Sequence, residues 1–126
     1  METTHTVLLI EDESHAVFAI EKSLTSAGFS VLSAFSAQEG LKLALEKHPD
    51  AIILDVMMPA ENGLNILPEL REDSWGKNAK IIVFSNLSSD AFKATANKYH
   101  VDKYLIKTDT SLKELEEILR NIQFQT

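Results

Sequence analysis

Short apolar runs alternate five times with segments of helical spacing, and this alternation limits the folds open to the chain. The runs lie at 6–10, 29–35, 51–54, 80–84 and 103–106. A crossover between parallel strands is right-handed and packs the apolar stripe of its helix on the sheet. We therefore predict an α/β fold: a doubly wound five-stranded parallel sheet, strand order 2-1-3-4-5, with five helices on its two faces.

Capping and helix-breaking residues mark the expected helix ends. Gly28 is placed to end the first helix, and Ser36 with Glu39 three residues later predicts a capping box for the second. Pro68 is tolerated only in a first helical turn, so the third helix should begin late, near Asn65. One apolar stripe of the last helix consists of Leu112, Leu115, Leu119 and Ile122.

Length and charge restrict the class of protein. The 126 residues predict a single domain, 1–126, with a folded core at about 5–122. No apolar run approaches the roughly 20 residues of a membrane span, residues 1–5 lack a signal-peptide pattern, and cysteine is absent, so we expect a cytoplasmic location. A net charge of −7 argues against direct binding to nucleic acid or to an anionic membrane.

Polar residues stand where four of the apolar runs end. Asp55 follows the buried run 51–54, Glu11 and Asp12 follow the first run, Ser85 follows the fourth and Lys107 the fifth. Each has an ordinary structural explanation. Asp55 and Ser85 are suited to turns or caps, the acids after the first run favour a helix N-terminus, and Lys107 suits a solvated edge.

The predicted strand order favours a shared site over these separate structural explanations, because it brings the carboxyl ends of the strands together where the winding reverses. Three carboxylates about 4 Å apart repel by roughly 4 kcal/mol per pair at an effective dielectric constant near 20. Glu11, Asp12 and Asp55 would therefore need a cation. Oxygen ligands that leave positions for water and a phosphate are the set that Mg²⁺ prefers.

The same residues resemble the receiver domain of two-component response regulators, a family with a flavodoxin-like, CheY-like fold. The resemblance covers essentially the whole chain, and its five motifs have the order and spacing of the family. They are Glu11-Asp12, Asp55 with Met58-Pro59, Gly63, Ser85, and Tyr104 to Lys107.

The resemblance implies that Asp55 accepts a phosphoryl group from a phosphohistidine on a sensor histidine kinase or a phosphotransfer protein. It also implies that Asp12, Asp55 and the main-chain carbonyl of Met57 bind Mg²⁺, with Glu11 acting through water. The chain would catalyse only its own phosphorylation and dephosphorylation, and is not expected to be an enzyme in any wider sense.

A conformational switch is implied as well. Lys107 would pair with one phosphoryl oxygen, and the Ser85 hydroxyl would donate to another, which lets Tyr104 change rotamer. The surface of the fourth helix, fifth strand and fifth helix would then change. This surface would address a downstream protein target or an output domain, and homodimerisation on phosphorylation stays open.

Three departures from the family pattern occur near the site. Asn86 replaces a very small residue, where it would either crowd or hydrogen-bond the phosphoryl pocket. Thr108 replaces a proline that usually has a cis peptide; because a cis non-proline bond costs about 2.5–4 kcal/mol, we predict a trans peptide after Lys107. Met57 and Leu87 occupy the positions that tune water access, and neither can orient water, so we expect a long-lived aspartyl phosphate.

Other functions fit less well. A phosphatase with an aspartyl intermediate needs an Asp-x-Asp pair after the first strand, and a nucleotide or flavin binder needs a glycine- or hydroxyl-rich loop there; Glu11-Asp12-Glu13 is neither. The stronger alternative is a receiver-like interaction module that is never phosphorylated, with Asn86 and Thr108 as signs of drift.

Overall fold

A five-stranded parallel sheet forms the centre of the structure, a computed structural model that describes residues 4–122. The strand order is β2-β1-β3-β6-β7, which confirms the predicted order 2-1-3-4-5. The strands are β1 (Thr6–Ile10), β2 (Ser30–Ala34), β3 (Ala51–Leu54), β6 (Ile81–Ser85) and β7 (Lys103–Ile106). The predicted domain span of 1–126 also includes residues 1–3 and 123–126, which lie outside the described residues.

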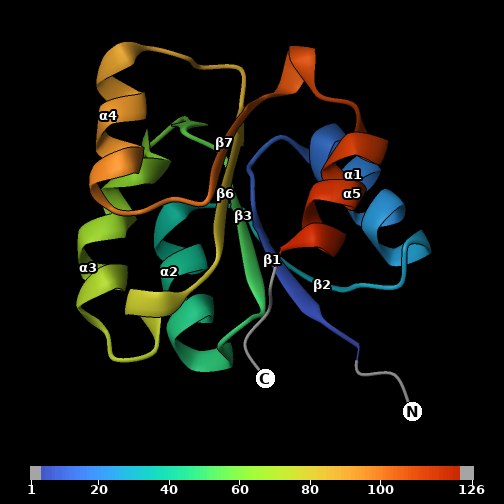
Figure 1. Ribbon diagram of the computed structural model, residues 1–126, viewed down its shortest axis with the longest axis horizontal. Coiled ribbons are helices and arrows are strands. Elements are labelled where there is room, and N and C mark those ends of the chain that lie inside the picture. The colour runs from blue at the N-terminus through green and yellow to red at the C-terminus, as the bar shows by residue number, and fades with distance from the viewer. Residues whose placement is uncertain (1–3, 123–126) are drawn as a thin grey trace.

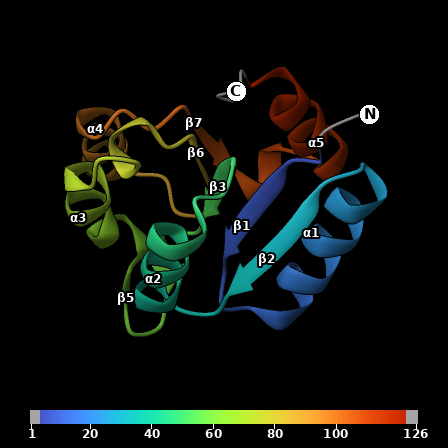
Figure 2. The same ribbon diagram turned by 90° about the horizontal axis from the view of Figure 1, so that it is seen from below.

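Helices cover both faces of this sheet, as Figures 1 and 2 show. One face carries α1 (Ser14–Ser26) and α5 (Leu112–Asn121). The other carries α2 (Ala37–Lys47), α3 (Leu67–Glu72) and α4 (Asp90–Lys98). The predicted three-layer arrangement with helices on two faces is therefore confirmed.

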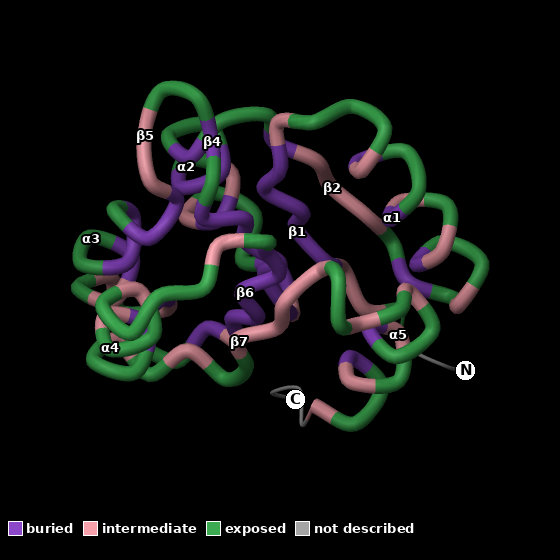
Figure 3. The backbone as a smooth tube through the Cα atoms, turned by 90° about the horizontal axis from the view of Figure 1, so that it is seen from above, coloured by how far each residue is buried: buried purple, intermediate pink, exposed green. Residues whose placement is uncertain are grey.

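Alternate side chains of each strand enter two separate apolar clusters, because successive residues of a strand point to opposite faces. Leu8 and Ile10 of β1 join the cluster beneath α2 and α3, whereas Val7 and Leu9 join the cluster beneath α1 and α5. Nearly all residues of β1, β3 and β6 are buried, whereas the residues of the edge strands β2 and β7 are more exposed (Figure 3). The central strands are thus buried on both faces, and the side chains that follow them emerge at the ends of a packed sheet.

The first two helices end largely where the sequence predicted. Gly28 follows the end of α1 with φ of +99°, a conformation that favours glycine. At α2 the Ser36 hydroxyl accepts a hydrogen bond from the Glu39 N–H at 3.1 Å. The Glu39 carboxylate, however, accepts from the N–H of Phe35 at 2.8 Å and not from that of Ser36, so the reciprocal half of the predicted capping box is wrong. Phe35 lies just beyond β2, where its N–H is available to the carboxylate.

The segment after β3 contains structure that the sequence did not predict. A two-stranded antiparallel hairpin joins β4 (Met57–Met58) to β5 (Glu61–Asn62). A 3-10 turn, Gly63–Ile66, then leads into α3, and Pro68 lies in the first turn of that helix. The late start predicted for this helix is confirmed. Within residues 4–122, no helix has the length and apolar character that crossing a membrane would require.

Polar side chains at the amino ends of the strands bond to main-chain groups. The Asp50 carboxylate accepts from the Thr6 N–H at 2.7 Å, and the Asp102 carboxylate accepts from the Ile81 N–H at 2.8 Å. Arg71, in α3, donates to four main-chain carbonyls, those of Gly76, Ala79, Tyr99 and His100. At this amino edge of the sheet, Asp50, Asp102 and Arg71 therefore hydrogen-bond mainly to main-chain groups.

Candidate functional site

The carboxyl ends of β1 and β3 bring two acidic side chains together. Ile10 pairs with Leu54 in the sheet, so Glu11 and Asp55 leave the two strands side by side. The Asp55 N–H still donates to the Ile10 carbonyl at 3.0 Å, which holds the two chain segments at this spacing. Glu11 is 1% exposed and Asp55 is 5% exposed. Carboxylates buried this deeply need neutralising partners.

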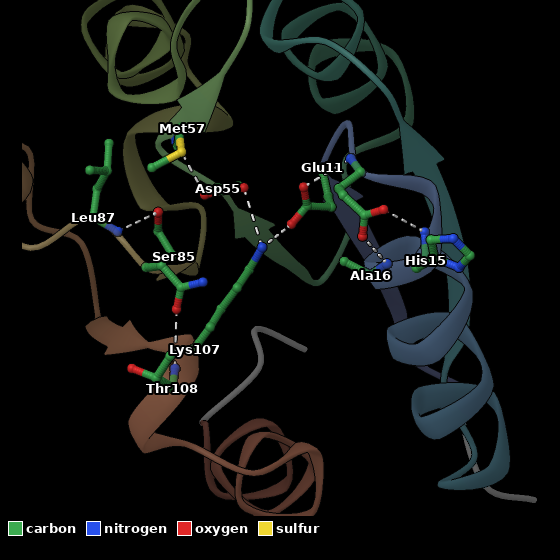
Figure 4. Close-up of polar contacts among 11 residues, drawn as sticks. Glu11, His15, Ala16, Asp55, Met57, Ser85, Leu87, Lys107 and Thr108 are labelled. Carbon is green, nitrogen blue, oxygen red and sulfur yellow. Dashed lines mark hydrogen bonds and ion pairs between the residues drawn. The ribbon is translucent and has the colours of Figure 1, made fainter.

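Asp12 and Lys107 complete the charged cluster. One carboxylate oxygen from each of Glu11, Asp12 and Asp55 lies within 4.8 Å of the others. The Lys107 ammonium contacts the Glu11 carboxylate and lies 3.3 Å from Asp55 Oδ2 (Figure 4). Three carboxylates facing one ammonium leave an excess of negative charge, and every acidic donor is an oxygen. The donor set therefore fits a hard divalent cation such as Mg²⁺.

The electrostatics of Glu11 and Lys107 agree with this excess of negative charge. Burial raises the pKa of Glu11 above its ordinary value, and the hydrogen bond from Lys107 opposes this only in part. For Lys107, burial acts to lower the pKa, but the hydrogen bond to Glu11 and the charge of Asp55 outweigh it, so that the pKa is raised. The ammonium is therefore firmly charged at neutral pH, available to an incoming anion.

The turn that follows Asp55 is packed tightly against it. Asp55 Oδ1 accepts from the Met57 N–H at 3.2 Å, and the Gly63 N–H donates to the Val56 carbonyl at 2.9 Å. A Cβ on Gly63 would lie 2.0 Å from the main-chain oxygen of Asp55. Gly63 is therefore required by the close approach of two backbone segments beneath the acid, which gives a physical reason for its place in the sequence pattern.

A pocket of about 450 Å³ opens above these groups. One of its walls is formed by β4 and Pro59. The lining residues are Glu11, Asp12, Glu13, Asp55, Met57, Met58, Pro59, Asn86 and Lys107. The structure thus brings Asp55, Asp12, Glu11, Met57 and Lys107 into one site.

The comparison with known families decides which kind of site this is. The sequence matches the family described as response regulator receiver domain over residues 7–120. The chain belongs to this family. The resemblance inferred from the sequence is thereby confirmed, and with it a place for this receiver domain in two-component systems.

Relatives and solved structures agree with the assignment. The receiver domain is 33% identical over 126 residues to the probable transcriptional regulator ycf27 of Guillardia theta, which covers 100% of this chain and 48% of the relative. It spans about half the length of the curated relatives it matches. The chemotaxis protein CheY4 of Vibrio cholerae has a TM-score of 0.87 at 24% identity, with 96% of this chain and 100% of that chain covered.

A second solved structure has a metal in its site. It is the receiver domain of the sensor histidine kinase PA1611 of Pseudomonas aeruginosa, with a magnesium ion coordinated in the active-site cleft. Its TM-score is 0.83 at 24% identity, and the alignment covers 94% of this chain and 96% of that chain. Both solved structures confirm the CheY-like fold of the receiver domain.

Ser85 and Tyr104 of the receiver domain are not among the residues that line the pocket. Ser85 is fully buried, and its hydroxyl accepts from the Leu87 N–H at 3.2 Å (Figure 4). The Tyr104 hydroxyl donates to the Leu87 carbonyl at 2.7 Å. The main chain of Leu87 therefore connects the two residues that the sequence singled out as a switch. Sequence reasoning missed this connection because main-chain groups carry no residue identity.

The two departures at the ends of β6 and β7 contact each other. The described residues contain no cis peptide, so the predicted trans bond between Lys107 and Thr108 is confirmed. The Thr108 N–H donates to Asn86 Oδ1 at 3.2 Å. A proline in place of Thr108 would have no N–H to donate. Both residues therefore contribute to one contact across the rim of the pocket.

Proposed function

We propose that this receiver domain takes a phosphoryl group from a phosphohistidine onto Asp55, in a reaction that depends on Mg²⁺. The observation that carries the proposal is the position of Asp55. Its carboxylate is nearly buried, reaches a 450 Å³ pocket, and lies 3.3 Å from the ammonium of Lys107 among two further acids. A nucleophilic carboxylate needs such a surrounding, because the charge that develops on the phosphoryl group must be neutralised.

The residues that would hold Mg²⁺ are Asp12, Asp55 and the main-chain carbonyl of Met57, with Glu11 acting through water. The excess of carboxylates over cations supports this assignment, and so does the magnesium ion of the related PA1611 structure. When bound, the ion would neutralise charge on the phosphoryl oxygens. Lys107 contacts one oxygen of the Glu11 carboxylate. The other oxygen accepts a hydrogen bond from the Glu13 N–H at 3.1 Å.

The transfer forms one bond and breaks one bond. A carboxylate oxygen of Asp55 forms a bond to phosphorus as the bond from phosphorus to the histidine nitrogen breaks, and the leaving imidazole takes up a proton. Lys107 stabilises the acquired negative charge by pairing with a phosphoryl oxygen. Since Lys107 already contacts Asp55, only a small movement of its side chain is required. The domain catalyses only this transfer to itself and the later hydrolysis of its own aspartyl phosphate, in which water forms the new bond to phosphorus, the bond to Asp55 breaks and inorganic phosphate leaves.

Ser85 and Tyr104 would transmit the change to the surface. The Ser85 hydroxyl hydrogen is available to a phosphoryl oxygen, but to reach it the side chain must turn and weaken its bond with Leu87. Movement of Leu87 would then alter the hydrogen bond that its carbonyl accepts from Tyr104. The surface formed by α4, β7 and α5 changes as a result.

The proposed partners follow from this arrangement. A sensor histidine kinase or a phosphotransfer protein supplies the phosphoryl group, and a downstream protein target or an output domain reads the α4–β7–α5 surface. One relative is a probable transcriptional regulator, and the net charge of −7 argues against direct binding of nucleic acid by these residues. Homodimerisation on phosphorylation and a cytoplasmic location stay predictions.

A phosphorylation assay tests the proposal. Intact protein is incubated with acetyl phosphate and Mg²⁺, and its mass is measured beside that of Asp55→Asn and of the wild type treated with a chelator. We expect one added phosphoryl group on the wild type with Mg²⁺ and none on either control. A wild-type mass that does not change would favour the alternative, an interaction module in which Asn86 and Thr108 have closed the site to phosphorylation.

A further inference from the structure

The pocket of the receiver domain has few groups that can bind an anion. Of its described lining residues, only Lys107 and Asn86 have side-chain hydrogen-bond donors, and four of the others are acids. Ser85 is buried and is not among the lining residues. A phosphoryl group carries about 1.5 to 2 negative charges and three acceptor oxygens, so it requires donors on more than one side.

The contact with Thr108 determines which way the Asn86 amide faces. A main-chain N–H can only donate, so the atom that accepts from the Thr108 N–H is the Asn86 side-chain carbonyl oxygen. The NH₂ group of a planar amide is then directed away from Thr108. Within residues 4–122 that NH₂ group forms no hydrogen bond, and Asn86 is an exposed residue that lines the pocket.

The same contact also ties two chain segments together. Asn86 follows the end of β6, and Thr108 stands one residue after Lys107. The hydrogen bond therefore links the segment that carries the amide to the segment that carries the ammonium. In a chain with proline after the lysine this link could not form, because proline has no N–H.

We propose that Asn86 is a phosphoryl-binding residue of this receiver domain: its NH₂ group, oriented by the Thr108 main chain, donates to an oxygen of the phosphoryl group on Asp55. This inference rests on the proposed function and names a further residue of the same site. Asn86 thus supplies a neutral donor on the β6 side of the pocket, opposite the acids of β1. The alternative role for a large residue at this position is steric crowding, which would have the opposite effect on affinity.

The test uses beryllium fluoride, an analogue of the phosphoryl group on an aspartate, with Mg²⁺ and the whole chain. Affinity is measured by calorimetry for the wild type, Asn86→Ala, Asn86→Asp and Thr108→Ala. We expect Asn86→Ala to bind the analogue roughly tenfold more weakly, as for loss of one hydrogen bond to a charged group. Asn86→Asp should bind more weakly still, because it keeps an oxygen for Thr108 but replaces the donor by a negative charge. Thr108→Ala keeps the N–H and should match the wild type.

Two further measurements separate binding from folding. Affinity for Mg²⁺ alone should be the same in Asn86→Ala as in the wild type, and the melting temperature should fall by only a few degrees, because a single hydrogen bond to Thr108 is lost. In the wild type, the side-chain amide proton resonances of Asn86 should shift when the analogue binds. A purely structural residue would instead change the affinity for Mg²⁺ and for the analogue together.

The outcomes distinguish this inference from the function on which it rests. If the wild type binds the analogue and Asn86→Ala binds it equally well or more tightly, the assignment of Asn86 is wrong and phosphorylation of Asp55 stands. If the wild type neither binds the analogue nor accepts a phosphoryl group from acetyl phosphate, both proposals are overturned.

Discussion

The two edges of the central sheet use charged side chains in opposite ways. At the amino edge, Asp50 and Asp102 accept from main-chain N–H groups at 2.7 and 2.8 Å. At the carboxyl edge, Glu11, Asp12 and Asp55 lie within 4.8 Å of one another. Acids bonded to backbone donors stabilise a fold, whereas acids that face each other repel and are retained for what they bind. We therefore expect the charged groups of the amino edge to stabilise the fold, and the facing acids of the carboxyl edge to lower its stability.

Arg71 provides the strongest test of the amino edge. We expect Arg71→Ala to lower the free energy of unfolding by about 3 kcal/mol or more, because four main-chain carbonyls lose a charged donor at once. Arg71→Lys should recover only part of this, since an ammonium lacks the planar fork of donors. Urea unfolding, with the exposed Arg120→Ala as control, measures both. Equal stability of Arg71→Ala and Arg120→Ala would contradict our description of this edge.

Met57 tests the function of the carboxyl edge. Its side chain is 53% exposed and lines the pocket, whereas Leu87 packs partly against the core. We therefore expect Met57→Asn, which supplies a group that can orient water, to speed loss of the phosphoryl group by roughly tenfold or more. Decay of phosphorylated protein, followed by intact mass, measures the rate, and Met57→Leu is the matched control. An unchanged lifetime in Met57→Asn would end the idea of a long-lived phosphate.

Replacing an aspartate by asparagine should change the free energy of unfolding in opposite directions at the two edges. Asp12→Asn removes repulsion from two acids, and without metal it should raise the free energy of unfolding by about 0.5–2 kcal/mol. Asp102→Asn weakens the hydrogen bond from the Ile81 N–H, and should lower the free energy of unfolding by about 0.5–1.5 kcal/mol. Urea unfolding with a chelator present compares the two. Changes of the same sign would remove the distinction between the edges.

The smallest expected effect concerns pH. Burial raises the pKa of Glu11, so its contribution to stability is present below the ordinary value of 4.5 and is lost as pH rises through the folded-state pKa. Backbone hydrogen bonds from Ala16 and His15 lower the pKa of Glu13, whose contribution is present above 4.5 and is lost as pH falls through its folded-state pKa.

Glutamine variants separate these two effects in metal-free protein. As pH rises from about 4 to 7, the free energy of unfolding of Glu11→Gln should increase relative to that of the wild type. Over the same range, that of Glu13→Gln should decrease relative to the wild type. Unfolding by urea at several pH values measures both trends. Parallel trends for the two variants would show that burial does not govern Glu11.

Much of the fold and site followed from the order of residue types along the chain. Runs such as Ala51–Leu54 are apolar throughout and must be buried on both faces, which predicts a parallel sheet with covering helices. The first residue after such a run emerges at the carboxyl edge, so Asp55 and Glu11 could be placed at the same rim from their positions alone. Gly63 belonged to the pattern, although its reason, the close approach to the Asp55 main chain, is visible only in space.

The tertiary structure decided the contacts made through the main chain. Leu87 joins Ser85 to Tyr104 by its N–H and carbonyl, and Arg71 bonds to carbonyls up to 29 residues away in sequence. Every residue has a main-chain carbonyl, and every residue except proline has a main-chain N–H, so residue types do not reveal these contacts. The β4–β5 hairpin and the Glu39 contact with Phe35 were missed for the same reason. The sequence by itself determines the chemistry of each side chain and the pattern of apolar residues. The hydrogen-bond partners of main-chain groups depend instead on which segments folding brings within about 3 Å of each other.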